Sequence, residues 1–247
     1  MKRKISCGLL LSLILFLNSC SNHVPARHRR NLPYCYNGKN TGIDTIININ
    51  GYYEIHENSG ATYEYGYGKW ATTVVDTFPT KFMFFKDGTF LHGFSDYNHR
   101  PGNIPKYFEE VVSNTQKGER DPFFQHASWG CYIISGNIIK TQYVTRPSGI
   151  GSGYWDLTEE WFKVIDKNTL KSIFRKNVTN SDSKIIYDNK TTENTQYTRG
   201  HETITLDSAK FIPTPLVPGS DCWLKYKKWF WCDRDKYEEW KKKIEKK

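Results

Sequence analysis

Short runs in which apolar and polar residues alternate cover most of the chain, and turn residues separate them. The clearest run spans residues 81–94, where an Asp-Gly pair lies between two aromatic stretches. Asp and Gly tolerate the positive φ angles of a two-residue hairpin turn, so the pattern predicts a β-hairpin with Asp87 and Gly88 at its tip.

This turn fixes which residues of the hairpin lie on the same side of the sheet. Phe84 is expected to face Leu91, and Phe85 to face Phe90. One predicted side carries Phe82, Phe84 and Leu91, and the other carries Met83, Phe85 and Phe90. A hairpin that is apolar on both sides needs a barrel interior or second sheet on one side and a further cover outside.

Two more hairpins follow. The first spans 129–144 with Gly136 and Asn137 as its turn, and the second spans 160–175 with its turn at 166–169. In the first, one side is expected to carry Tyr132, Ile134, Ile139 and Tyr143. In the second, one side is expected to carry Phe162, Val164, Leu170, Ser172 and Phe174.

Further strands are expected at 45–55 (interrupted at Gly51), 69–76, 184–188, 198–206 and 210–212. The total is about eight to ten antiparallel strands in sequence order. A meander of this size removes its exposed edges by closing on itself, so the prediction is an all-β, up-and-down barrel over residues 43–213.

Two segments differ from the strands. A short helix is expected at 105–115, with Tyr107, Phe108, Val111 and Val112 facing inward, either as a lid at the barrel mouth or as simple packing. Residues 214–247 form an aromatic and basic segment that ends in a charged helix from Asp233. Trp223, Trp229 and Trp231 are expected to cover the outer apolar side of the barrel. Contact with a membrane surface is the alternative.

The N-terminus carries an export signal. Residues 1–19 combine a basic start with an apolar run that is too short to span a bilayer, and Leu17-Asn18-Ser19-Cys20 resembles a bacterial lipobox. This resemblance implies cleavage before Cys20 and acylation of Cys20, with residues 20–42 as anchor and tether. Ser21 favours the outer membrane, and the absence of an acidic run after Cys20 favours its periplasmic leaflet. An ordinary cleaved signal peptide is the alternative.

Composition is consistent with an exported β protein. Aromatic residues make up 15% of the chain, and the formal charge of +9 falls to +6 once the three basic residues of the signal are removed. No nucleic-acid partner is expected in this compartment.

The mature chain keeps Cys35, Cys131, Cys222 and Cys232, which allow three disulfide connectivities. Cys222 with Cys232, and Cys35 with Cys131, is the preferred pairing. Metal binding is the weaker alternative because no metal-ligand spacing is present.

Catalytic patterns are missing from the sequence. The adjacent pair Glu159-Glu160 is expected to diverge on a strand, and His92 is expected to be structural. No nucleophile-elbow pattern occurs. The chain is therefore expected to be non-enzymatic and to use no cofactor.

Several short motifs together resemble one family. The motifs are Gly51-Tyr52-Tyr53, Phe84 to Phe90, Gly130 to Ile139, Trp161 to Ile165 and the tail from Ser220 to Trp231. In these motifs the chain resembles the lipocalin-like lipoproteins of Bacteroidetes, a calycin-type family. The lipocalin G-x-W signature has Tyr53 in place of Trp, and no T-D-Y triplet occurs.

The alternation and the resemblance together give a functional expectation. A barrel of about eight strands is just wide enough for one small ligand or for its own side chains. The first reading is a small apolar or amphipathic ligand inside the barrel. The second is an envelope interaction module with a filled interior and a protein partner. The expected lining consists of Tyr53, Phe82, Phe84, Leu91, Tyr132, Ile134, Tyr143, Phe162 and Phe174.

Overall fold

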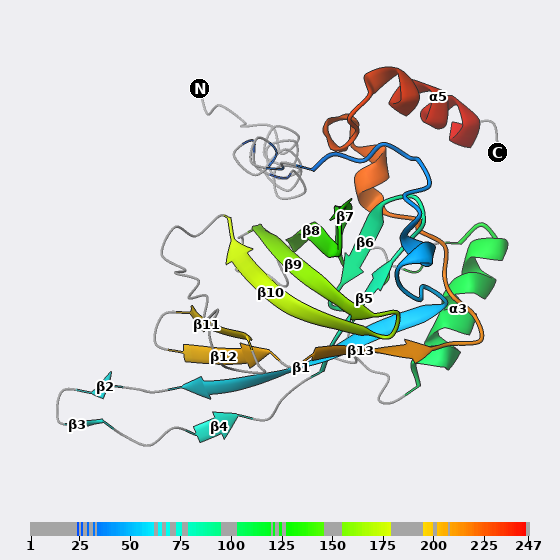
Figure 1. Cartoon of the computed structure of the whole chain (residues 1–247). Coiled ribbons are helices and arrows are strands. Elements are labelled where there is room, and N and C mark those ends of the chain that lie inside the picture. Colours follow the sequence, from blue (N-terminus) through cyan, green and yellow to red (C-terminus); the bar gives the residue numbers. More distant parts are fainter. Residues whose placement is uncertain are drawn as a thin grey trace, which may run out of the picture.

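The computed structural model describes residues 24, 26, 29, 32, 34–61, 64–65, 68–69, 73–75, 79–94, 103–119, 121, 124, 127–145, 155–178, 195–199, 202–206 and 208–245. The predicted signal peptide, Cys20 and the strand expected at 184–188 lie outside these residues. Figure 1 shows the chain, with the strands curled around one interior and the C-terminal helix outside them.

Eight antiparallel strands close into an up-and-down barrel, which confirms the predicted fold class. They are β1 (Gly51–Ala61), β5 (Pro79–Phe84), β6 (Thr89–His92), β7 (Ser128–Ser135), β8 (Ile138–Thr145), β9 (Asp156–Asp166), β10 (Thr169–Asn177) and β13 (Ser208–Pro213). Each pairs with the next in this order. The first half of β1 closes the ring, because Tyr53 pairs with Phe82 of β5 on one side and with Phe211 of β13 on the other.

The second half of β1 leaves the barrel and enters a smaller group of strands. It pairs with β4 (Thr73–Val75) and with β12 (Glu202–Leu206), which in turn pairs with β11 (Thr195–Arg199). A separate pair, β2 (Glu64–Tyr65) and β3 (Gly68–Lys69), lies beyond it. Figure 1 shows these strands extending from the lower part of the barrel. The strand expected at 198–206 is thus a hairpin, and the one at 69–76 is split between β3 and β4.

One end of the barrel is plugged by the residues before β1. The sequence predicts a strand from residue 45, but a short 3-10 helix (Ile43–Thr45) occurs there, and β1 begins at Gly51. Ile43 and Ile47 are fully buried in the interior cluster, so this segment closes the barrel. A Cβ atom at Gly51 would lie 2.1 Å from the carbonyl oxygen of Ile212, which explains glycine where β1 meets β13.

The β5–β6 hairpin has a different register from the expected one. Phe84 pairs with Phe90 and Met83 with Leu91, because the turn contains three residues rather than two. Gly88 has a φ of 90°, and Asp87 accepts hydrogen bonds from the backbone and hydroxyl of Thr89. A three-residue turn with glycine in the left-handed region shifts every pairing by one residue. Phe90 therefore points inward and Leu91 outward, the reverse of the prediction.

The β7–β8 hairpin confirms its prediction. Ser135 pairs with Ile138 and Ile134 with Ile139, with Gly136 at a φ of 61° in the two-residue turn.

The β9–β10 hairpin contains an irregularity that the alternation does not reveal. Ser172 pairs with Phe162, but Phe174 pairs with Trp161, so Ile173 is an extra residue. Such a β-bulge reverses the side on which the following residues lie. Phe174 therefore contacts Trp161 outside the barrel, with ring centroids 4.6 Å apart and planes tilted by 35°, and the prediction that it lines the interior is wrong.

The outer apolar side of the barrel is covered as expected. The cover consists of α3 (Ile104–Gln116), two 3-10 helices, η3 (Trp223–Tyr226) and η4 (Lys228–Phe230), and α5 (Arg234–Glu245). Phe108 of α3 contacts Tyr52 of β1, with ring centroids 6.3 Å apart. Phe230 and Trp231 share a buried cluster with Met83. The described helix α3 thus packs on the outside of the barrel.

Candidate functional site

The interior next to the plugged end is filled by aromatic side chains. Phe82 and Phe162 are fully buried, and their ring centroids lie 4.8 Å apart. Six of the nine expected lining residues belong to this cluster and are at most 4% exposed: Tyr53, Phe82, Phe84, Tyr132, Tyr143 and Phe162. Ile134 packs against it as a partly buried neighbour.

Two expected lining residues lie elsewhere. Leu91 belongs to the outer cluster because of the three-residue turn, and Phe174 faces outward because of the bulge at Ile173. Phe90 takes the inward place expected of Leu91 and contacts Phe84, with ring centroids 5.0 Å apart.

The other half of the interior carries a polar cluster. Arg175 Nη2 donates to Glu160 Oε2 at 3.2 Å, and Ser172 Oγ donates to Glu160 Oε1 at 3.0 Å. The Glu160 side chain has no exposed surface, and that of Arg175 is 11% exposed. A buried carboxylate is costly unless it is paired and hydrogen-bonded, and here both conditions hold.

The bulge at Ile173 creates this pair. Without the extra residue, the side chains of β10 would alternate regularly after Ser172, and Arg175 would point out of the barrel. With it, Arg175 pairs across the strands with Glu160. Glu160 already points inward because it lies two residues before Phe162 on β9.

His92 completes the cluster as a neutral acceptor. Its Nε2 atom lies 3.5 Å from Arg175 Nη2. Since a guanidinium has only donors, this geometry assigns the acceptor role to Nε2 and the proton to Nδ1. Burial and the nearby charge of Arg175 hold the pKa of His92 well below its usual value. The neutral ring carries no charge, so the contact of 3.8 Å between His92 Nε2 and Glu160 Oε2 is not an ion pair.

Aromatic rings connect the two halves of the interior. The His92 ring stacks on Tyr143, with centroids 4.1 Å apart and planes at 13°, and lies 6.4 Å from Phe82 in a parallel arrangement. The site thus has an apolar aromatic floor and a hydrogen-bonding group of Glu160, Arg175 and Ser172. We call this set, with His92 and Tyr143, the interior polar site. It places charged and hydrogen-bonding groups directly beside aromatic rings inside the barrel.

The sequence predicts this site in part. Tyr143 and Ser172 are expected on the inner side, whereas Glu160 is expected in a divergent pair and His92 in a structural role. The alternation of β9 carries a signal, because it places Glu160 on the same side as Phe162. Arg175 has no such signal, since its inward direction depends on the bulge.

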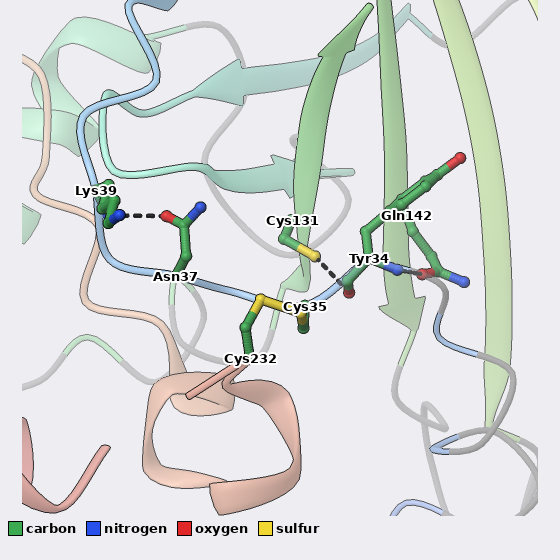
Figure 2. Close-up of a disulfide and its surroundings, with 7 residues drawn as sticks. All are labelled: Tyr34, Cys35, Asn37, Lys39, Cys131, Gln142 and Cys232. Carbon is green, nitrogen blue, oxygen red and sulfur yellow. Dashed lines mark hydrogen bonds between the residues drawn. A yellow bond between two sulfur atoms is a disulfide. The ribbon is translucent and has the colours of Figure 1, made fainter. Parts of the chain in front are cut away.

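The disulfide differs from the preferred pairing. Cys35 is bonded to Cys232, whereas Cys131 and Cys222 carry buried free thiols. Figure 2 shows Cys131 beside this bridge, where its thiol donates to the backbone oxygen of Tyr34 at 3.0 Å. Burial raises the pKa of both thiols, that of Cys222 to about 12. The preferred pairing is wrong because the first cysteine joins the tail rather than β7.

A second network attaches the tail to the β5–β6 turn. Lys225 Nζ lies 2.6 Å from Asp87 Oδ2, which also accepts from Ser220 Oγ at 2.7 Å and Tyr36 OH at 3.1 Å. Burial alone would raise the pKa of Asp87, but Lys225 and these hydrogen bonds hold it below its usual value. This network is fully satisfied and has a structural role.

Comparison with known proteins identifies no relative: no family model, curated protein or solved structure matches the chain. Within the described residues, no group of three or more histidine, cysteine or acidic side chains is placed to hold a metal ion. No helix in this part of the chain combines the length and apolar character needed to cross a membrane.

Proposed function

We propose that this protein is a non-enzymatic lipoprotein of the bacterial envelope whose barrel binds a small amphipathic ligand at the interior polar site. The observation that carries the proposal is the buried Glu160–Arg175 pair, which lies inside the barrel directly beyond an aromatic floor. An amphipathic molecule matches both parts: its apolar portion contacts the rings, and its polar portion exchanges hydrogen bonds with Arg175 and Ser172.

The anchor in this proposal comes from the N-terminal sequence. The basic start, the apolar run and the lipobox ending at Cys20 support acylation, and Ser21 supports sorting to the outer membrane, facing the periplasm. Intact mass measurement of the protein purified from bacterial membranes tests it. A diacylglyceryl group and an amide-linked acyl chain on Cys20 are expected, and Cys20→Ser is expected to lack both.

Ligand binding is tested on the full acylated protein purified from its own envelope. Native mass spectrometry should detect a bound small molecule, and solvent extraction should release it. The matched test variant is Glu160→Gln/Arg175→Met, which removes both charges together and so leaves neither one buried alone. We expect this variant to lose the bound mass while it retains the circular dichroism of the barrel.

The control lies one residue along each strand. Glu159 and Lys176 pair across β9 and β10 like Glu160 and Arg175, but they point outward. Glu159→Gln/Lys176→Gln should keep the bound molecule. Equal occupancy in both double variants would refute the interior polar site as the binding site.

The filled aromatic half supports a second candidate, an interaction module of the envelope. Six expected lining residues pack against one another and leave that half without a place for a ligand. If native mass spectrometry finds no small molecule and chemical crosslinking in cells retains one envelope protein, this second function replaces the first.

A further inference from the structure

The segment that follows the predicted anchor is attached to the barrel almost from its start. Val24 is 5% exposed and packs in a small cluster with Val144, Trp155 and Leu157 on the outside of β8 and β9. Leu32 packs against the same cluster. Both contacts lie within the residues that the sequence suggested as a tether.

This attachment limits how far Cys20 can lie from the barrel. Val24 lies four positions after Cys20, and a fully extended chain spans at most about 14 Å over four residue steps. An acylated Cys20 lies at the membrane surface. The bilayer that holds the acyl chains must therefore lie close to the Val24 cluster.

Two tryptophans border this cluster. Trp223 and Trp229 are partly buried and pack against it, and the Trp223 ring lies 5.7 Å from Trp155. Lys227 and Lys228 lie between them in the sequence. Lys228 Nζ is paired with Glu238 Oε1 of α5 at 2.7 Å, so Lys227 is the lysine of this surface. Tryptophan is enriched at membrane–water interfaces, and lysine is attracted to anionic headgroups.

Several contacts keep this face in place. Tyr36 forms a parallel bridge with Trp231, and Cys35 is bonded to Cys232. Tyr34 donates from its backbone to Gln142 and from its hydroxyl to Glu159 at 2.8 Å. Figure 2 shows this strip of chain held between β8 and the C-terminal segment. Residues 34–36 are therefore joined both to the barrel and to the C-terminal segment that carries the two tryptophans.

We infer that this surface, defined by Trp223, Lys227 and Trp229, contacts the phospholipid bilayer that holds the acyl chains. The barrel then has a fixed orientation on the membrane instead of hanging from a flexible tether. The inference rests on the proposed acylation of Cys20. Its occupant is the headgroup region of an anionic bilayer, since the surface combines interfacial aromatic residues with the basic side chain of Lys227.

The test uses the full acylated protein in vesicles of phosphatidylethanolamine and phosphatidylglycerol, with part of the lipid brominated on its acyl chains. Bromine quenches nearby tryptophans, so the quenched fraction of the emission should fall by about half or more in Trp223→Phe/Trp229→Phe. Trp161→Phe is the matched control. It removes an outward tryptophan of β9 that lies four residues, or about 13 Å, along the strand from Leu157. Its quenched fraction should not fall.

The outcomes separate this inference from the proposed function. Intact mass of the same sample reports acylation, and without acyl groups both proposals fail. If acyl groups are present but the two variants are quenched equally, or no quenching occurs, the membrane contact is overturned and the proposed function is not. Shielding of Trp223 and Trp229 from acrylamide in a detergent-solubilised dimer would assign the face to a second copy, which also overturns it.

Discussion

At the scale of single residues, the most informative feature is a charge pair buried inside a β-barrel. Glu160 Oε2 and Arg175 Nη2 lie 3.2 Å apart, and the two side chains have almost no exposed surface. Such a pair contributes little net stability compared with apolar residues of similar volume, because the loss of hydration offsets the attraction. This small net contribution is what the proposed recognition of a polar group would predict.

The pair gives a stability prediction. Arg175→Met leaves the Glu160 carboxylate buried without its cation, so it should lower the free energy of unfolding by about 3–5 kcal/mol. Glu160→Gln/Arg175→Met should cost much less, because no charge is left alone. Urea denaturation of both variants measures the difference. Equal losses of unfolding free energy in the single and double variants would contradict a buried ion pair between Glu160 and Arg175.

His92 gives a pH prediction. Its pKa is lowered in the folded state, so below its unfolded-state value of about 6.5 the unfolded chain binds more protons than the folded one. The free energy of unfolding should therefore fall as the pH drops below about 6.5, by up to about 1.4 kcal/mol per pH unit. His92→Phe should show a shallower fall in urea denaturation between pH 6.5 and 5. A slope equal to that of wild type would count against a buried neutral imidazole. His56→Gln controls for loss of an imidazole outside the barrel.

At the scale of strands and turns, small irregularities decide which side chains reach the interior. The bulge at Ile173 turns Phe174 outward, whereas Phe162 on the neighbouring strand remains in the core. Phe162→Ala should lower the free energy of unfolding by about 3–5 kcal/mol, as for other large core residues. Phe174→Ala should cost only about 1 kcal/mol. Thermal or urea unfolding of the two variants compares them, and equal costs would place Phe174 inside after all.

The same irregularities limit what can be predicted from the sequence. Alternation and turn residues predict the barrel, and the turn at Gly136 is specific enough to give the β7–β8 register correctly. The Asp87-Gly88 pair is ambiguous, because it fits a two-residue turn and also a three-residue turn with glycine last. The bulge at Ile173 leaves no signal in the sequence. Arg175, one of the five residues of the interior polar site, could therefore not be predicted.

At the scale of the whole molecule, the two ends of the chain are joined. Cys35 near the N-terminus is bonded to Cys232, Tyr36 bridges to Trp231, and Lys225 is paired with Asp87 on the β5–β6 turn. The disulfide links residues 197 positions apart, so the loop that it closes contains all eight strands of the barrel. Cross-links that close long loops restrict the unfolded chain most strongly.

The last prediction concerns this cross-link. Chain-entropy arithmetic for a loop of this length gives about 5 kcal/mol, and native disulfides removed from proteins typically cost about 2–5 kcal/mol. Cys35→Ser/Cys232→Ser should therefore lose about 2–5 kcal/mol in urea denaturation, and a reducing agent should destabilise wild type but not this variant. The Asp87–Lys225 pair and the Tyr36–Trp231 bridge remain, so the C-terminal segment should stay attached under native conditions and resist proteolysis. Rapid cleavage before α5 in the folded variant would instead mean that the disulfide alone keeps the tail on the barrel.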